Sequence, residues 1–334
     1  MKLSNIKEKL FNKKDLSLGE SSYLFNLILE GEVLEIDLAS ILIALKFKEE
    51  TKDEILGATI ALRKKSLKIK APLNCVDTCG TGGDMSGTLN ISTSAAIIAA
   101  SAGANIAKHG NRSISSKSGS ADMLEKLGYK IKSQSKELEK SLKDFNFCFM
   151  FAQNHHSAMK NVKNVRQTLA TRTIFNLLGP LTNPALAKRQ ILGVFDKKWV
   201  KIHCEVLKDL GSERAMVVHG EDGLDEISLC SSTFIAELKD NKIKNYIFNP
   251  IDYGYKLINK KDILGKGPEY NAKAFLDILE APDNSFQKII ELNAGAALYL
   301  AEKVNNLRDG FDLARKSIKT FKSKKFFENM IKNQ

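Results

Sequence analysis

Short apolar runs alternate with helical stretches through most of the 334-residue chain, and this alternation limits the possible folds more than any other feature. The apolar runs are Cys75 to Thr78, Asn105 to Lys108, Lys130 to Lys132, Phe147 to Phe151, Gln190 to Phe195 and Ala215 to His219. The helical stretches are Ser92 to Ala102, Ala121 to Leu127 and Trp199 to Leu210. Parallel strands need long crossover connections, which are usually helices. The pattern therefore predicts an α/β domain with a central, mainly parallel sheet flanked by helices.

The first 71 residues lack this alternation. Apolar residues recur with helical period from Leu18 to Ser66, and there is hardly a strand signal. Pro72 closes this section, because the residue before a proline is biased away from the helical conformation. We therefore expect a small all-helical domain over residues 1–71 and an α/β domain over residues 72–334. Residues 155–178 are again helical in pattern, and we expect about 160–185 to return to the small domain.

The composition is that of a globular protein, with 43% hydrophobic and 27% charged residues. The formal net charge of +12 invites a nucleic-acid-binding function, and a non-catalytic binder of nucleic acid stays one alternative. The lysines are mixed with acidic residues, however, and the basic runs Arg63 to Lys70 and Arg315 to Lys325 match no nucleic-acid module. Since a basic field also suits a small polyanionic substrate, we expect no nucleic-acid partner.

The cysteines and the N-terminus bear on the compartment. Five cysteines, an odd number without a CxxC pair, are typical of reduced thiols. Met1 to Asp15 lack the continuous apolar stretch of a secretory signal. The longest weakly polar run, Ala95 to Ala107, is shorter than the roughly 20 apolar residues that a membrane span needs. We therefore expect a cytoplasmic protein without a membrane partner.

A glycine-rich segment, Asp77 to Asp84 (DTCGTGGD), directly follows a predicted buried strand. Glycine lets the backbone turn sharply and present N–H groups to an anion. Two common phosphate motifs do not fit, because the dinucleotide pattern needs glycine where Met85 stands and no GK[ST] follows. The segment indicates a phosphate-binding loop, although a tight turn without a ligand remains open for the loop alone.

Two further segments favour phosphate at the same edge of the sheet. Asn90 to Ser94 place hydroxyl groups at a helix N-terminus, where the macrodipole attracts anions, although Ser92 alone could be an ordinary N-cap. Lys108 to Ser113 (KHGNRS) follow the next strand and lead into Ser115, Ser116, Ser118 and Ser120. Loops after parallel strands gather at the carboxyl edge, so this loop would face the glycine loop. Taken alone, it is more often a solvated turn.

An acidic loop and one arginine complete the candidate site. Asp225 and Glu226 follow another predicted strand, and a bound Mg²⁺ would relieve their repulsion while bridging to substrate phosphates. An acidic surface turn explains this stretch equally well. Arg166 precedes the helical segment 171–184, and an arginine on a helix can clamp a carboxylate through two hydrogen bonds. An ordinary surface salt bridge is the commoner explanation for any single arginine.

Together these motifs resemble the anthranilate phosphoribosyltransferases, of the nucleoside phosphorylase/phosphoribosyltransferase fold family. The likeness covers nearly the whole chain and rests on GTGGD, NIST, KHGNRS, GSAD, RTIFNLLGPLTNP and GLDE in order and rough spacing. The resemblance implies transfer of the phosphoribosyl group from 5-phospho-α-D-ribose 1-diphosphate to anthranilate in tryptophan biosynthesis. It also implies a Mg²⁺ requirement and a homodimer formed through the helical domain. The glycine loop also resembles pyrimidine nucleoside phosphorylases, which leaves phosphorolysis as an alternative.

Carried over by motif, the resemblance implies a substrate-binding set formed by Gly80, Gly83, Asp84, Thr88, Asn90, Ile91, Ser92, Thr93, Lys108, His109, Gly110, Asn111, Arg112, Ser113, Ser115, Ser116, Ser120 and Arg166. Within this set it implies catalytic roles for Lys108, Asn111 and Arg166, with Arg166 on the anthranilate carboxylate. Ser92, Asp225 and Glu226 would serve Mg²⁺. The chain departs from the family pattern at Met85, Leu89 and Ser157, which bear on packing and loop stiffness more than on ligand chemistry.

Overall fold

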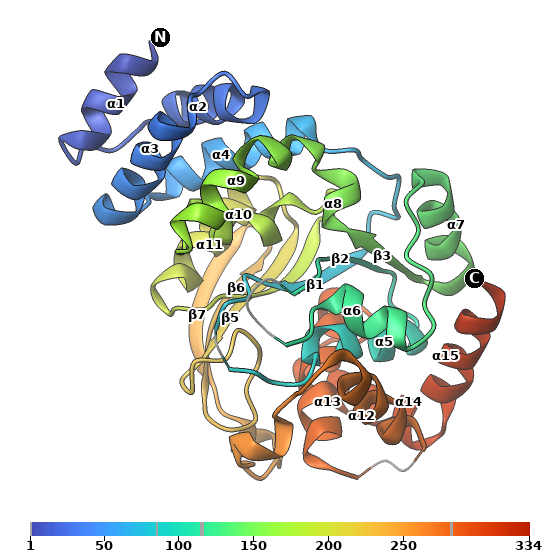
Figure 1. The fold of residues 1–334 in the computed structure, drawn as a ribbon. Helices are drawn as coiled ribbons and strands as arrows, with labels where there is room; N and C mark the ends of the chain where they lie inside the picture. Colours follow the sequence, from blue (N-terminus) through green and yellow to red (C-terminus); the bar gives the residue numbers. More distant parts are fainter. Residues whose placement is uncertain (1, 85, 114–116, 281–282) are drawn as a thin grey trace.

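The computed structural model describes residues 2–84, 86–113, 117–280 and 283–334, and begins with a small helical unit, blue in Figure 1. Its first four helices are α1 (Leu3–Phe11), α2 (Leu18–Glu30), α3 (Glu35–Lys48) and α4 (Lys52–Lys65). Two later helices, α9 (Lys160–Leu169) and α10 (Ile174–Leu178), pack against them and share their apolar core through Val162, Val165 and Ile174. On this packing we propose that the segment of about 160–185 belongs with residues 1–71.

Local sequence specifies where two of these helices begin. Ser17 and Glu20 form a capping box at the start of α2, and Thr51 and Glu54 form another at the start of α4. Each box satisfies backbone N–H groups that the first turn of a helix leaves without an intrahelical partner. Glu54 is also buried, where it accepts a hydrogen bond of 2.9 Å from the Leu16 backbone N–H. The same carboxylate therefore starts one helix and holds the segment before another.

A seven-stranded sheet with the order β3-β2-β1-β4-β5-β6-β7 forms the centre of the larger unit. Its parallel strands are β1 (Val76–Gly80), β2 (Ile106–Gly110), β3 (Phe147–Phe151), β4 (Arg189–Gly193) and β5 (Arg214–Gly220). The antiparallel strands β6 (Thr233–Lys239) and β7 (Lys242–Phe248) extend one edge. The chain first winds outward from β1 to β3 and then returns to place β4 beside β1. This reversal is a topological switch point, where the carboxyl ends of strands form a binding crevice.

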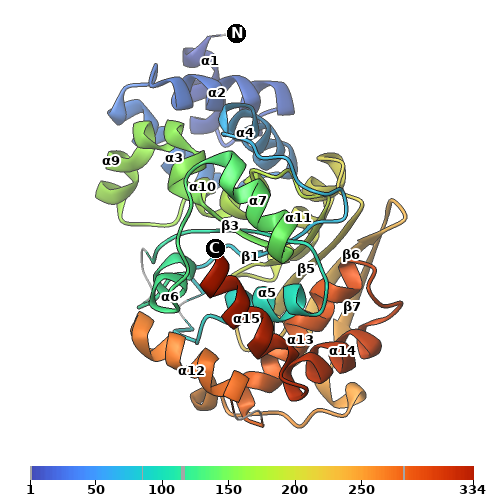
Figure 2. The same cartoon turned by 90° about the vertical axis from the view of Figure 1, so that its right-hand side faces the viewer.

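Helices cover both faces of the sheet (Figure 2). Ile191 of β4 packs into the core under α5 (Ile91–Ser101) and α13 (Ser285–Leu300), whereas its neighbour Leu192 faces α11 (Lys198–Asp209) and the helical unit. Alternate residues face opposite sides because a strand has a side-chain period of two. The remaining helices are α6 (Ser120–Lys126), α7 (Ser135–Phe145), α8 (Ala152–His155), α12 (Pro268–Glu280), α14 (Leu307–Lys319) and α15 (Lys322–Asn333), with short 3₁₀ turns η1 (Ser157–Met159), η2 (Gly179–Thr182), η3 (Pro250–Tyr253) and η4 (Lys260–Ile263).

The predicted architecture of a small helical unit and an α/β unit is confirmed, and five of the six predicted strands are present. The strand expected at Lys130 to Lys132 was wrong. Only Ile131 of these three residues packs against the core, and the Lys130 N–H donates to the side chain of Gln334 instead of to a strand. A short apolar run between lysines can therefore fill a core without joining a sheet.

The hairpin of β6 and β7 was not anticipated. These strands are joined by Asp240 and Asn241, both with positive φ, as a two-residue hairpin turn requires. The Asp-Asn pair between two strand-like runs was the sequence signal for this turn.

Among the described residues, none of the helices combines the length and the apolar character needed to span a bilayer.

Candidate active site

The glycine loop leaves β1 at the switch point and folds over the end of β4. Gly82 and Gly83 have φ values of 63° and 73°, a conformation that other residues rarely adopt. The Thr81 N–H donates to the Gly193 carbonyl at 2.9 Å, and the Gly82 N–H donates to Asp225 Oδ2 at 2.9 Å. The glycines are therefore needed for the path of the backbone, and the loop is tied to the acidic loop after β5.

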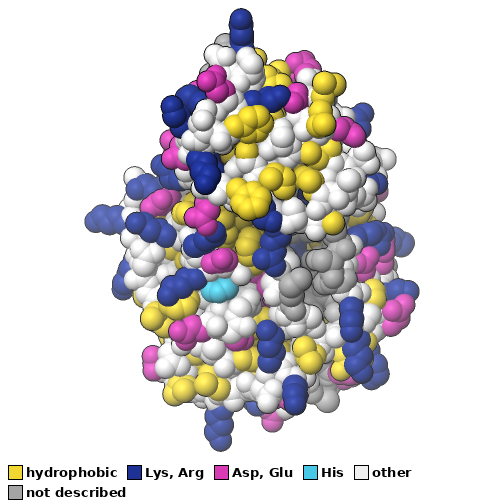
Figure 3. Space-filling model, turned by 60° about the vertical axis from the view of Figure 1, so that its left-hand side comes forward, with side chains coloured by type: hydrophobic (Ala, Val, Ile, Leu, Met, Phe, Trp, Pro, Cys, Tyr) yellow, Lys and Arg dark blue, Asp and Glu magenta, His cyan; other side chains and the backbone are white. Residues whose placement is uncertain are grey.

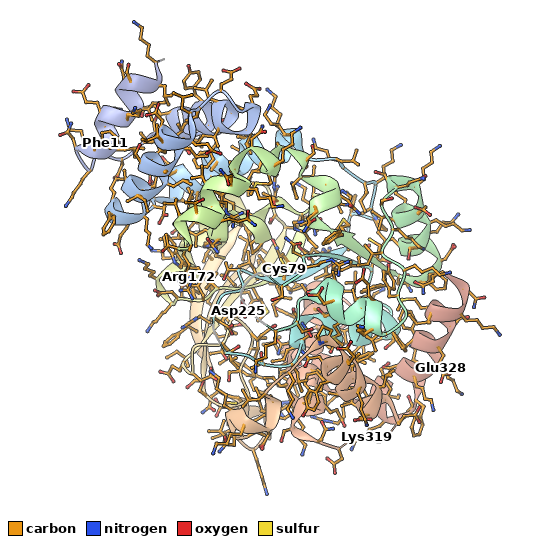
Figure 4. The ribbon with its side chains drawn as sticks, in the orientation of Figure 1. Phe11, Cys79, Arg172, Asp225, Lys319 and Glu328 are labelled. Atoms are coloured by element: carbon orange, nitrogen blue, oxygen red, sulfur yellow. The ribbon has the colours of Figure 1, made fainter. Side chains whose placement is uncertain are left out.

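Arg172, from the segment between α9 and α10, holds the same loop from the other side. Its guanidinium donates to the Gly83 carbonyl and lies 4.3 Å from the ring centroid of Phe195. Figure 4 shows Arg172, Cys79 and Asp225 near one another in the middle of the molecule. The glycine loop thus lies between the helical unit and the carboxyl edge of the sheet.

The N-terminus of α5 faces the acidic loop. The Ser92 N–H donates to Glu226 Oε1 at 3.1 Å, and the hydroxyl of Thr93 donates to Ser120 Oγ at 3.0 Å. Asn90 has a supporting contact, because its Oδ1 accepts hydrogen bonds from Asn271 at 2.8 Å and from Ser118 at 3.1 Å. The helix N-terminus and the hydroxyls predicted for phosphate therefore lie at the switch point, with the Ser92 N–H paired to Glu226 in this structure.

Lys108 is buried between β1 and the start of α5, with 1% of its surface exposed. Its ammonium donates to the Thr78 carbonyl and lies 3.5 Å from Ser92 Oγ. It makes no ion pair within the described chain. Burial lowers its pKa, and the negative charges of Asp77, Glu226 and Asp225 nearby oppose that shift. A buried lysine so placed offers its charge to an anion at the end of β1.

Asp225 and Glu226 are two half-buried carboxylates in adjacent positions. Loss of hydration raises the pKa of both, and repulsion adds to the shift, from Asp84 on Asp225 and from Asp225 on Glu226. A divalent cation would remove this penalty. The described residues contain no cluster of three or more His, Cys, Asp or Glu side chains that could hold a metal alone. Mg²⁺ is usually held by one or two carboxylates together with substrate phosphates, so the pair fits it.

Arg166 lies on α9, half-buried, with its guanidinium 5.3 Å from the ring centroid of Phe175. Burial lowers its pKa. No hydrogen bond or ion pair joins this guanidinium to the rest of the described chain. A partly buried arginine without a counter-charge is available to a ligand carboxylate.

The KHGNRS loop is only partly directed at the switch point. Arg112 forms a bidentate pair with Glu125 at 2.6 and 2.7 Å and contacts Asp122 at 2.9 Å, so α6 holds its guanidinium. Asn111 Oδ1 accepts a hydrogen bond from the Arg112 N–H. The substrate roles of these two residues stay predictions. Ser115, Ser116 and Met85 lie outside the described residues.

The other predicted residues occupy varied places. Gly80 has no room for a side chain, since a Cβ would lie 2.4 Å from Asp225 Oδ2. Asp84 accepts a hydrogen bond from the Ser86 N–H at 3.1 Å. Thr88 forms an isolated antiparallel bridge with Leu264. Three more are constrained by packing: a Cβ on Gly110 would lie 2.7 Å from the Phe149 ring, Ile91 is buried in the core, and Ser113 donates its N–H to Asp122 at 3.0 Å.

His109 and His156 lie side by side, with ring centroids 5.2 Å apart. Burial lowers the pKa of both rings, that of His156 to about 4. Both rings are therefore neutral at pH 7. That state suits an apolar wall better than a charged contact with substrate.

Two supporting residues, Asp77 and Asn293, were not among the predicted site residues. Asp77 is buried in β1, where it accepts hydrogen bonds from the His109 N–H at 3.0 Å and the Gln190 side chain at 3.3 Å. Asn293 of α13 pairs with the backbone of Ile227, directly after Glu226. A carboxylate inside an apolar strand and an asparagine inside an apolar helix were the available signals.

Comparison with known proteins agrees with this geometry. Residues 4–66 match the helical bundle domain of the glycosyl transferase family, and residues 73–323 match the α/β domain of that family. The anthranilate phosphoribosyltransferase of Methanobrevibacter smithii is 44% identical over 97% of this chain and 96% of the relative. That of Azorhizobium caulinodans is 46% identical over 91% of this chain and 88% of the relative.

Solved structures with these names superimpose on the chain. The anthranilate phosphoribosyltransferase of Thermus thermophilus gives a TM-score of 0.91 at 35% identity, over 97% of this chain and 98% of that one. The Saccharomyces cerevisiae protein in complex with PRPP and Mg gives 0.89 at 27% identity, over 99% and 97%. The yeast complex with 4-fluoroanthranilate gives 0.88 at 26% identity, over 99% and 96%.

Proposed function

The chain belongs to the anthranilate phosphoribosyltransferase family, and from this we propose the reaction and the role of each residue in it. The protein transfers the phosphoribosyl group of 5-phospho-α-D-ribose 1-diphosphate to anthranilate, giving N-(5-phosphoribosyl)anthranilate and pyrophosphate in tryptophan biosynthesis. One observation carries the assignment of residues: Lys108, the start of α5 and the Asp225–Glu226 pair converge on the switch point. A diphosphate matches the positive charge of Lys108 and of the helix N-terminus, and a divalent cation matches the negative charge of Asp225 and Glu226.

The reaction breaks the bond between the anomeric carbon and the diphosphate oxygen and forms a bond from that carbon to the amine nitrogen, which loses one proton. Lys108 and the positive N-terminal end of the α5 dipole stabilise the negative charge that develops on the leaving diphosphate. Arg166 holds the anthranilate carboxylate and so aims the amine. Asp225, Glu226 and the Ser92 hydroxyl would hold Mg²⁺, which would supply further positive charge toward the diphosphate.

No strong general base is needed at this site. An aromatic amine is neutral at pH 7, and its nitrogen lone pair already attacks as a nucleophile. The buried histidines His109 and His156 shape the entrance for the aromatic ring rather than remove a proton. Asn111, within the KHGNRS loop, orients anthranilate together with Arg166. Positioning and electrostatics therefore carry most of the rate acceleration.

The protein is proposed to work as a homodimer that pairs through the helical unit. Leu34, Ile36 and Phe47, on or next to α3, are 72%, 79% and 78% exposed. Ile36 and Phe47 are three helical turns apart and so lie on one face of α3. Figure 3 shows hydrophobic side chains gathered over this part of the molecule. Exposed apolar patches of this kind mark interaction sites.

A cytoplasmic location stays a prediction, supported by five free cysteines.

The fluorescence of anthranilate tests the reaction directly. Purified protein with phosphoribosyl pyrophosphate and Mg²⁺ should remove the anthranilate signal, and a chelator should stop the loss. A folded, Mg²⁺-replete protein that leaves anthranilate unchanged would contradict the proposal. Phosphate-dependent release of base from thymidine or uridine would then favour the phosphorylase alternative. Tight, salt-sensitive retention of nucleic acid on a filter would favour the binding alternative.

A further inference from the structure

The segment that carries Asp225 and Glu226 crosses directly over the end of β4. A Cβ built on Gly193 would lie 1.5 Å from the backbone oxygen of Asp225, so glycine alone leaves room for this crossing. The loop between β5 and β6 therefore rests on the backbone of the switch-point strands. The position of both carboxylates depends on the path of this loop.

Few contacts hold the carboxylates themselves. Asp225 accepts one N–H from Gly82, and Glu226 accepts one from Ser92, and both donors lie in segments that must themselves be placed. Both side chains are half-buried and adjacent along the chain. Neighbouring carboxylates repel each other when both are ionised, so their placement depends on contacts to the backbone of the loop.

Asn293, in the middle of α13, makes that attachment. Its Oδ1 accepts the Ile227 N–H at 3.0 Å, and its Nδ2 donates to the Ile227 carbonyl at 3.0 Å and to the Ile289 carbonyl at 2.9 Å. Asn293 is 2% exposed. Both N–H donors of the amide are used, and Ile227 is paired through both of its backbone groups. The side chain therefore acts as a short strand partner for the residue that follows Glu226.

We propose that Asn293 is a positioning residue for the metal-binding pair and acts through the backbone of Ile227. Gly193 contributes by leaving room for the loop that carries the pair. This inference rests on the proposed function, because it assigns Asp225 and Glu226 to a divalent cation that is shared with the diphosphate. Asn293 bonds to the backbone of Ile227, the residue after Glu226, and its hydrogen bonds in the described chain go to no carboxylate. Partners behind metal ligands typically change metal affinity about 10- to 100-fold when removed.

Binding of Mn²⁺ in the presence of phosphoribosyl pyrophosphate, followed by electron paramagnetic resonance without anthranilate, tests this proposal on the whole protein. Asn293→Ala should weaken Mn²⁺ binding about 10- to 100-fold and raise the Mg²⁺ concentration needed for half-maximal activity by a similar factor. The KM for anthranilate should stay within about twofold. Gln287→Ala is the matched control, because Gln287 is a buried amide on the same helix that bonds to Glu291 and does not touch the acidic loop.

A second variant covers the case in which Asn293→Ala does not fold. Asn293→Asp keeps the shape and the acceptor for the Ile227 N–H, but it lacks the two N–H donors, so Mn²⁺ binding should again weaken. The proposal would be overturned if a folded Asn293 variant bound Mn²⁺ as tightly as Gln287→Ala does. It would also be overturned if the wild-type protein bound no Mn²⁺ in the presence of phosphoribosyl pyrophosphate. Wild type that binds Mn²⁺ normally yet leaves anthranilate unchanged would instead overturn the proposed reaction.

Discussion

At the scale of single residues, the proposed site is defined by charges that the protein leaves without partners. Arg166 and Lys108 make no ion pair within the described chain, and Asp225 and Glu226 are adjacent, half-buried carboxylates. An unpaired buried charge costs several kcal/mol, so such groups are retained where a ligand supplies the missing partner. In the proposed site, the anthranilate carboxylate would pair with Arg166, the diphosphate with Lys108, and a divalent cation with Asp225 and Glu226.

Arg166 is predicted to govern affinity for anthranilate. Arg166→Ala should raise the KM for anthranilate about 10- to 100-fold, because a charge-assisted bidentate pair contributes roughly 1.5–3 kcal/mol. The KM for phosphoribosyl pyrophosphate should change little. Steady-state kinetics with each substrate varied in turn provides the measurement, and Lys163→Ala on the exposed side of α9 is the control. Equal rises in both KM values would point to a misfolded helical unit and against the clamp.

His156 is predicted to make stability depend on pH. Its pKa is lowered to about 4 by burial, below the unperturbed value of about 6.5. Between these values the unfolded chain binds a proton that the folded chain does not, so stability is full above pH 6.5 and falls as the pH drops toward 4. From pH 7 to 5 His156 should contribute a loss of about 2 kcal/mol.

Urea unfolding at pH 7 and pH 5 measures this loss. In His156→Gln the difference in unfolding free energy between the two pH values should shrink by about the same 2 kcal/mol. The neighbours His109 and His155, whose pKa values burial also lowers, keep the rest of the dependence. An unchanged pH dependence in the variant would show that His156 does not titrate differently on folding.

At the scale of secondary-structure elements, close packing depends on a few small residues. Gly57 of α4 lies against α2, where a Cβ would be 2.6 Å from the Leu18 carbonyl and 2.8 Å from the Ser22 nitrogen. The capping boxes set where each helix starts, and Gly57 sets how closely the two helices approach. A glycine inside a helix costs about 1 kcal/mol relative to alanine, and the close contact offsets that cost.

Gly57→Ala is therefore predicted to destabilise the helical unit by about 1–3 kcal/mol through overpacking. Gly19→Ala on α2 is the matched control, because a Cβ there meets no atom within 4 Å, and it should be neutral or stabilising by up to about 1 kcal/mol. Chemical denaturation followed by circular dichroism compares the two. The reverse order of stability would show that the helices separate without cost.

At the scale of the whole molecule, the site lies where the two units meet. Arg172 and Arg166 come from the segment that packs with the helical unit, whereas Lys108 and the acidic pair belong to the sheet. Under the proposed assignment, the residues for anthranilate and those for the diphosphate belong to different units, which the contact between Arg172 and the Gly83 carbonyl joins. This arrangement suits a reaction between two substrates that must be brought into line.

The assembly prediction belongs to this scale. Replacing Ile36 and Phe47 together by glutamate should convert the proposed dimer to a monomer, because charged groups would have to be buried against an apolar partner. Light scattering after gel filtration should show the mass fall to half that of the wild type. The pair Ile247→Glu and Ile251→Glu, exposed on the α/β unit, is the control and should leave the mass unchanged. A wild type that is already monomeric would contradict the proposed dimer.

The sequence by itself determined the α/β class, five parallel strands, the helical N-terminal unit and the segments that meet at the switch point. These properties follow from local periodicity, from glycine's backbone freedom and from the rule that parallel strands end at one edge. The hairpin of β6 and β7 carried a weaker local signal, the Asp240–Asn241 turn.

Only the tertiary structure decided which charges have partners. The sequence placed both Arg112 and Arg166 in the substrate-binding set, yet Arg112 pairs with Glu125 and Asp122 while the Arg166 guanidinium has no hydrogen bond or ion pair in the described chain. It also could not show that Asn293 reaches Ile227, 66 positions away. Local patterns record how a segment folds on its own. A side chain's partners depend on elements far apart in the chain, and burial then decides what each unpaired charge costs.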